Sequence, residues 1–154
     1  MEIINNQLQV AKIKLAYIIS LLVGLSLLVF VYSSYIFTVE AYVMLFLSIA
    51  LFLFFIYLII IKPEYIYFAQ IKNKIIIKNY PARPIFRNYK AFEIDLKSLY
   101  SYKIQKSFLN KKIELVLTIK TKKGTGNYPP MSLSALSTNE LKKLLTFLDK
   151  YSKE

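Results

Sequence analysis

The chain has 154 residues, of which 56% are hydrophobic, and its 21 Lys/Arg against 9 Asp/Glu give a formal net charge of +12. It contains neither cysteine nor histidine, which excludes disulfides, ordinary zinc sites and the Ser-His or Cys-His pairs of nucleophilic enzymes. Since the sequence offers no catalytic constellation, metal site or cofactor motif, we expect a protein that is not an enzyme.

Two uninterrupted apolar runs follow a short N-terminal segment. Residues 15–37 (LAYIISLLVGLSLLVFVYSSYIF) and residues 41–61 (AYVMLFLSIALFLFFIYLIII) contain no charged side chain. Each run is long enough to cross a bilayer as a helix, which takes about 20 residues at a rise of about 1.5 Å each. Because only residues 38–40 separate the runs, the sequence predicts two antiparallel membrane-spanning helices joined by an external turn.

The charges around these runs predict their orientation. Lys12, Lys14 and Lys62 flank the open end of the helix pair, whereas the turn carries no Lys or Arg. By the positive-inside rule, residues 1–14 and residues 63–154 both lie in the cytoplasm. We therefore expect a multi-pass protein of the cytoplasmic membrane with both termini cytoplasmic. The first run is too long for the apolar core of a signal peptide, so it is expected to be retained.

Small residues mark one face of the first span. Ser20 and Gly24 lie one turn apart, and such a pair lets another helix approach closely. The partner is either the second span or a second copy of the chain in an oligomer that lines a pore. The second span is favoured, because the short turn already holds it at high effective concentration. The absence of charge inside both spans argues against an ion or proton pathway.

Residues 1–14 show only a weak pattern. Ile4, Leu8 and Ala11 fall at helical spacing, which is typical either of a short helix lying on the membrane or of the start of the first span. The second interpretation is favoured, because the segment is short and has no aromatic anchor.

After residue 63 the apolar residues alternate with polar ones, which predicts a β-rich domain of about six or seven short antiparallel strands. The expected strands cover residues 64–71, 74–80, 91–96, 100–104, 113–121 and 127–133. The segment KKGTGN at residues 122–127 is expected to form a hairpin turn. The domain also holds most of the charge, since residues 63–154 carry 18 Lys/Arg and 7 Asp/Glu.

The last segment predicts a helix over residues 138–152. Ser137 and Glu140 have the spacing of a capping box, in which each side chain accepts a hydrogen bond from the other residue's backbone N–H. Leucines at 141, 144, 145 and 148 then form one apolar stripe, which we expect to be buried against the sheet.

This order of elements resembles the bacterial pleckstrin-homology-like (PH-like) domain, in which a helix plugs one end of a bent antiparallel barrel. The resemblance is carried by residues 74–80 (KIIIKNY), 94–106 (IDLKSLYSYKIQK), 113–124 (IELVLTIKTKKG) and 131–148 (MSLSALSTNELKKLLTFL). Many membrane proteins of this family place one or two spans just before the domain. The resemblance implies a membrane α-hairpin followed by an α+β domain, built as a PH-like barrel or sandwich with a C-terminal capping helix.

Members of this family that bind lipids carry basic residues in and around the first hairpin of the domain. The resemblance therefore implies a site for anionic lipid or another anionic ligand at Lys72, Lys74, Lys78, Arg83 and Arg87. The alternative interpretation is that these cations reflect only positive-inside bias and the lysines that commonly protect strand edges.

The sequence favours a membrane-tethered binding or scaffolding module. Its expected partners are the lipid bilayer, anionic headgroups, and a protein partner or a second copy of the chain. The membrane anchor argues against a specific nucleic-acid partner, although so basic a domain would bind polyanions at low salt. One alternative resembles the membrane-disrupting effectors of antiphage signalling, in which a cyclic oligonucleotide binds a β-barrel and drives oligomerisation of the spans. Another is an accessory or immunity subunit of a membrane complex.

Overall fold

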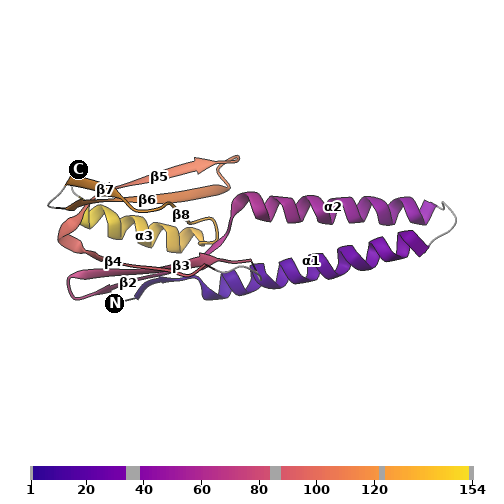
Figure 1. The fold of residues 1–154 in the computed structure, drawn as a ribbon, viewed down its shortest axis with the longest axis horizontal. Coiled ribbons are helices and arrows are strands. Elements are labelled where there is room, and N and C mark those ends of the chain that lie inside the picture. Colours follow the sequence, from indigo (N-terminus) through magenta and orange to yellow (C-terminus); the bar gives the residue numbers. More distant parts are fainter. Residues whose placement is uncertain (1, 34–38, 84–87, 122–123, 153–154) are drawn as a thin grey trace.

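The computed structural model describes residues 2–33, 39–83, 88–121 and 124–152. Within these residues the fold is α+β: two long helices, eight strands in two antiparallel sheets, and a C-terminal helix (Figure 1). The molecule is elongated, because the helix pair projects from one end of the β-domain and the strands run along nearly the same direction.

The two long helices are α1 (Gln7–Ser33) and α2 (Val39–Ile61), which lie side by side and antiparallel. Their side chains are mostly exposed: within an apolar 18-residue stretch of each helix, only 6% of the residues of α1 and 17% of those of α2 are buried. Both helices are thus long and apolar enough to cross a membrane. Of the expected turn at residues 38–40, the last two residues already belong to α2, and Thr38 lies outside the described residues.

The strands form two separate sheets. The first sheet has the order β1-β2-β3-β4, and in the second β5, β6 and β7 are neighbours while β8 pairs with β6. The strands are β1 (Glu2–Asn5), β2 (Glu64–Ile71), β3 (Lys74–Pro81), β4 (Lys90–Asp95), β5 (Leu99–Ser107), β6 (Lys112–Thr121), β7 (Gly124–Asn127) and β8 (Met131–Ser132). A short 3-10 turn, Leu96–Ser98, connects the sheets. The predicted α+β class with antiparallel strands is therefore confirmed, whereas the described strands do not form a closed barrel.

The C-terminal helix, α3 (Thr138–Tyr151), lies between the sheets and completes the core (Figure 1). Its capping box is present: Glu140 N donates to Ser137 Oγ (3.3 Å) and Ser137 N donates to Glu140 Oε2 (2.8 Å). Leu144 and Leu148 are buried in one cluster with residues of both sheets, including Phe68. The helix stripe therefore fills the space between two sheets that do not close on each other.

The strand β1 was not expected from the sequence. Its Ile4 pairs with Phe68 of β2 and is only 2% exposed, whereas Leu8, in the first turn of α1, is 77% exposed. The helical pattern proposed for residues 1–14 is therefore wrong for Ile4, because the open edge of β2 offers backbone hydrogen bonds that a short strand can complete. The chain before the spans thus contributes to the core of the domain after them.

The segment between β6 and β8 also differs from expectation. Residues 122–127 were assigned to a turn, but Gly124–Asn127 forms β7, and Thr118 of β6 pairs with Asn127. Gly124 adopts φ +127°, a conformation that glycine reaches without the steric cost of a side chain. The glycines that suggested a turn therefore begin a short edge strand.

Candidate functional site

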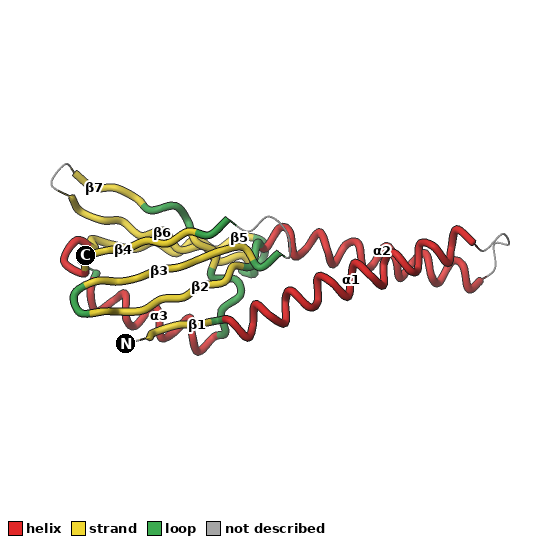
Figure 2. The backbone as a smooth tube through the Cα atoms, turned by 60° about the horizontal axis from the view of Figure 1, so that its bottom comes forward, coloured by secondary structure: helices red, strands yellow, loops and turns green. Residues whose placement is uncertain are grey.

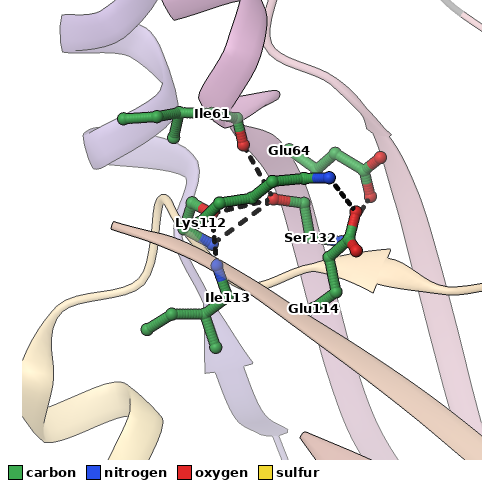
Figure 3. Close-up of polar contacts among 7 residues, drawn as sticks. Ile61, Glu64, Lys112, Ile113, Glu114 and Ser132 are labelled. Atoms are coloured by element: carbon green, nitrogen blue, oxygen red, sulfur yellow. Dashed lines mark hydrogen bonds and ion pairs between the residues drawn. The ribbon is translucent and has the colours of Figure 1, made fainter. Parts of the chain in front are cut away.

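A network of polar contacts attaches the end of α2 to both sheets (Figure 3). The Ser132 hydroxyl donates to the carbonyl of Ile61 (3.4 Å) and lies 3.1 Å from the Ser134 hydroxyl, which accepts from Ile113 N (3.1 Å). The last carbonyls of a helix lack partners within the helix, so a side chain from outside stabilises its end. Here that side chain comes from β8.

Glu64, the first residue of β2, extends this network to the first sheet. Its Oε2 atom accepts a hydrogen bond from Asn79 Nδ2 (2.9 Å) and one from Ser132 N (3.2 Å). Beside it, Lys112 and Glu114 form an ion pair of 2.9 Å between half-buried side chains (Figure 3). The Glu64 carboxylate therefore joins the two sheets next to the end of α2.

Asn6 makes the corresponding attachment for α1. It lies between β1 and α1, is fully buried, accepts from Ile66 N (2.7 Å) and donates to the Glu64 carbonyl (3.0 Å). One turn further, Gln9 donates to Glu140 at the start of α3 (3.0 Å). Because both chain segments that enter the helix pair are bonded to the β-domain, the domain has a fixed orientation relative to α1 and α2.

This orientation gives the domain two distinct ends. β2 leaves α2 at Glu64 and reaches its turn after eight residues, which at about 3.3 Å per residue places the turn about 26 Å away. Figure 2 shows the β2–β3 turn at the end opposite the spans. We call the end next to α1 and α2 the near end and the β2–β3 turn at residues 71–74 the far end. The near end comprises residues 62–64, 81–83 and 107–112.

Tyrosine and lysine side chains gather on the outer surface of the first sheet. Tyr65 and Tyr80 are opposite each other in β2 and β3 with their rings stacked at 4.6 Å, and the Tyr89 ring lies 4.7 Å from that of Tyr80. Lys14 of α1 places its Nζ 4.8 Å from the centre of the Tyr80 ring. Such cation–π contacts are favourable and hold the ammonium group over the ring.

The same surface continues along the strands. Lys78 is opposite Tyr67 in the β2–β3 pair, with its Nζ 5.8 Å from the centre of that ring. We call this set the tyrosine–lysine face. It comprises Lys14, Tyr65, Tyr67, Lys78, Tyr80 and Tyr89. The period-two pattern of β2 and β3 predicts which tyrosines share a face, but no sequence signal places Lys14 of the first span beside them.

The structure separates the cations predicted to form one site. Lys78 lies on the tyrosine–lysine face, and the exposed Arg83 follows Ala82, whose N–H donates to the carbonyl of Pro63 at the near end (2.8 Å). Lys72 and Lys74, by contrast, lie at the far end. Lys74 forms an exposed ion pair with Glu93 (3.2 Å).

The fifth predicted cation, Arg87, lies outside the described residues. The structure therefore brings Lys78 into one surface with Lys14, which the sequence did not suggest, and leaves the first hairpin's own turn remote from the spans.

The helix pair shows contact at Ser20 and open space at Gly24. Ser20 is 8% exposed and its hydroxyl donates to the Tyr17 carbonyl (3.0 Å). Gly24 lines a groove of about 370 Å³ between α1 and α2, together with Ser48, and a Cβ atom at Gly24 would meet nothing within 4 Å. Within the described helix pair, Gly24 does not serve a close approach of α2.

Across residues 2–33, 39–83, 88–121 and 124–152, no group of three or more acidic, cysteine or histidine side chains is arranged to hold a metal ion. Comparison with protein-family models finds no matching family, and comparison with curated proteins and with solved structures likewise finds no match. The class that the fold defines is a two-helix apolar hairpin rooted in an α+β domain.

Proposed function

We propose that this chain is a two-span protein of the cytoplasmic membrane, with both termini in the cytoplasm, whose β-domain is a non-enzymatic binding and scaffolding module for anionic lipid headgroups. The observation that supports it best is the contact of Lys14 with Tyr80, which joins the start of the first apolar run to the tyrosine–lysine face. If the helices span the bilayer, this face begins at the membrane surface.

The charges at the near end suit such a ligand. Lys62 and Arg83 are exposed there, and Lys111 lies in the β5–β6 turn. Each Lys or Arg close to an anionic leaflet contributes about 1 kcal/mol to membrane attraction, and tyrosine is favoured at headgroup depth. Lys72 and Lys74 lie about 26 Å further out by the length of β2, well beyond the Debye length of about 8 Å at physiological salt. Lys78 and the near-end cations therefore replace them in the proposed site.

The arrangement of two antiparallel sheets with a C-terminal helix between them supports assigning the domain to the PH-like type. The departure from that pattern is β1, a strand contributed from before the spans. We propose that β1, by pairing with β2 just before the first span, holds a PH-like domain in a fixed position on the membrane.

The second candidate function is a ligand-gated membrane effector. It is favoured by the adjacent rings of Tyr65, Tyr80 and Tyr89 beside two lysines, since aromatic rings and cations together suit a nucleotide ligand. The hydrogen bonds that connect the end of α2 and Glu64 to Ser132 are also suited to transmitting a movement of the domain to the spans. Cyclic nucleotides would depolarise cells that express this effector, whereas a lipid-binding scaffold would leave the membrane potential unchanged.

The lipid-binding proposal is tested by thermal unfolding of the full-length protein in neutral detergent, with phosphatidylglycerol or phosphatidylcholine added. A ligand that binds only the folded state raises Tm. We expect phosphatidylglycerol to raise Tm more than phosphatidylcholine, and the double variant Lys78→Glu/Arg83→Glu to lose most of that difference.

The matched control is Lys142→Glu/Lys143→Glu, which makes the same change of charge at exposed positions of α3. It should keep the difference between the two lipids. Equal losses in both variants would show only general electrostatics and would overturn the assignment of the site.

A further inference from the structure

The β5–β6 turn exposes two large apolar side chains in an otherwise basic domain. Phe108 and Leu109 are 45% and 90% exposed, and neither belongs to the core of the domain. The pairing of Ser107 with Lys112 fixes the start and end of the turn. An exposed apolar pair at a loop tip indicates a contact that the isolated chain does not satisfy.

This turn lies beside the end of the second apolar helix (Figure 1). The ring of Phe108 is 6.1 Å from the ring of Tyr57, centre to centre. Tyr57 lies one helical turn before Ile61, so the tip extends past the end of α2 and along its last turn. If α2 crosses the bilayer, Phe108 is already at the depth of a residue type that favours the membrane interface.

The backbone of the turn is held in an uncommon conformation. Phe108, Leu109 and Asn110 have φ values of 49°, 52° and 63°, and Lys111 N donates to the Phe108 carbonyl (3.0 Å). Left-handed conformations are familiar for asparagine but strained for side chains such as phenylalanine and leucine. Such strain persists where the surroundings require it and is often found at functional sites.

Lysines surround the apolar tip. Lys106 and Lys111 are exposed on either side of it, and Lys112 follows in the ion pair with Glu114. Apolar side chains flanked by lysine match the bilayer interface, where rings and aliphatic groups enter the acyl boundary and ammonium groups meet anionic headgroups. A protein partner would have to share this space with the lipid around Tyr57, so the bilayer is the favoured occupant.

We infer that the β5–β6 turn inserts Phe108 and Leu109 into the headgroup region of the leaflet at which α2 ends, as a third attachment of the β-domain. This inference rests on the proposed membrane placement of the spans. It adds an attachment from the second sheet, whereas the tyrosine–lysine face belongs to the first. The two contacts together would fix the tilt of the domain on the membrane.

The test uses the absence of tryptophan from the chain. Leu109→Trp, Ile71→Trp and Leu53→Trp each introduce one tryptophan, at the tip, at the far end and in α2, and all three positions are exposed apolar side chains. Each full-length variant is reconstituted into phosphatidylcholine–phosphatidylglycerol vesicles with brominated acyl chains. We expect quenching by bromine of the tryptophans at 109 and 53, and quenching by aqueous acrylamide of the tryptophan at 71.

The possible outcomes distinguish a failure of the turn insertion from a failure of the proposed membrane placement of the spans. Quenching by bromine at 53 but not at 109 would overturn the insertion of the turn and leave the spans in place. No bromine quenching at either position would overturn the membrane placement and the insertion with it. Quenching at 109 and equally at 71 would mean that the domain lies flat on the bilayer, which would also overturn the inference.

Discussion

Two hairpins of the β-domain, β2–β3 and β5–β6, have turns of opposite character. The β2–β3 turn is formed by Lys72 and Asn73, both exposed, whereas the β5–β6 turn presents Phe108 and Leu109. Both turns contain a residue with positive φ, so the backbone alone does not explain the difference. Their positions do: the first lies at the far end and the second beside the last turn of α2. This difference supports the proposed contact of the near end with an anionic bilayer.

The largest expected effect concerns how β1, which precedes the two long helices, completes the first sheet. Ile4→Asp places a carboxylate at a position 2% exposed, opposite Phe68. We expect it to lower the free energy of unfolding by about 3 kcal/mol or more, because an unpaired charge would be buried. Thermal unfolding of the full-length protein in detergent measures the change.

Leu8→Asp is the matched control, since Leu8 is 77% exposed a few residues further along. Equal stabilities of the two variants would mean that β1 does not hold the domain. For the same reason a fragment beginning at residue 63, which lacks Ile4 and Asn6, should aggregate through the open edge of β2.

The next largest effect is on the accessibility of the β5–β6 turn to protease, compared with that of the β2–β3 turn. Leu109→Asp should expose the β5–β6 turn in vesicles, because inserting a leucine side chain contributes about 1.5–3 kcal/mol, about tenfold or more in the inserted population. Trypsin should then cut after Lys111 faster than in the wild type. Cleavage after Lys72 at the far end serves as the internal reference and should not change. If trypsin cleaved after Lys111 at the same rate in both proteins, Leu109 would not hold the β5–β6 turn in the bilayer, and this proposed difference from the β2–β3 turn would be contradicted.

A smaller effect on stability is expected from removing the Ser132 hydroxyl, which bonds to the last residue of α2. Ser132→Ala removes the donor to the Ile61 carbonyl and should cost about 1 kcal/mol, as is typical of one buried hydrogen bond. Ser98→Ala at the far end removes an exposed local bond to the Asp95 carbonyl and should cost less. Unfolding midpoints that fall by the same amount in both variants would argue against a specific role of Ser132.

The smallest effect concerns pH. A hydrogen bond with Asp149 raises the pKa of Tyr102, and burial and the charge of Asp149 add to it. The folded state therefore favours the neutral phenol, and this stabilisation is present below the usual pKa of about 10 and lost as pH rises through the folded pKa. Tyr102→Phe should flatten the dependence of Tm on pH in that range, and an unchanged slope would show that the contact contributes nothing.

Local patterns predicted most of the fold. The strand at residues 64–71, the strand starting at residue 74 and the capping box at Ser137 follow from neighbouring residues, and the structure has them at those positions. The strand β1 did not follow, because its partner Phe68 lies 64 residues further along the chain and beyond two apolar runs. Sequence separation hides such pairings from any local pattern.

The candidate site was predictable only in part. The resemblance to lipid-binding PH-like domains predicts one site from five cations in and around the first hairpin, yet strand direction sends Lys72 to the far end and Arg83 to the near end. The contact of Lys14 with Tyr80 and that of Phe108 with Tyr57 join segments with no shared sequence signal. That Phe108 and Leu109 are exposed beside α2 depends on the three-dimensional arrangement of the β5–β6 turn, which no local sequence pattern encodes.

Amide hydrogen exchange of the full-length protein in nanodiscs of phosphatidylglycerol and of phosphatidylcholine tests the central claim most directly. The account predicts slower exchange in the anionic lipid at residues 81–83 and 108–111, with no change at the far-end turn of residues 71–74. Exchange that is the same in both lipids at the near end, or slowed at residues 71–74 instead, would contradict it.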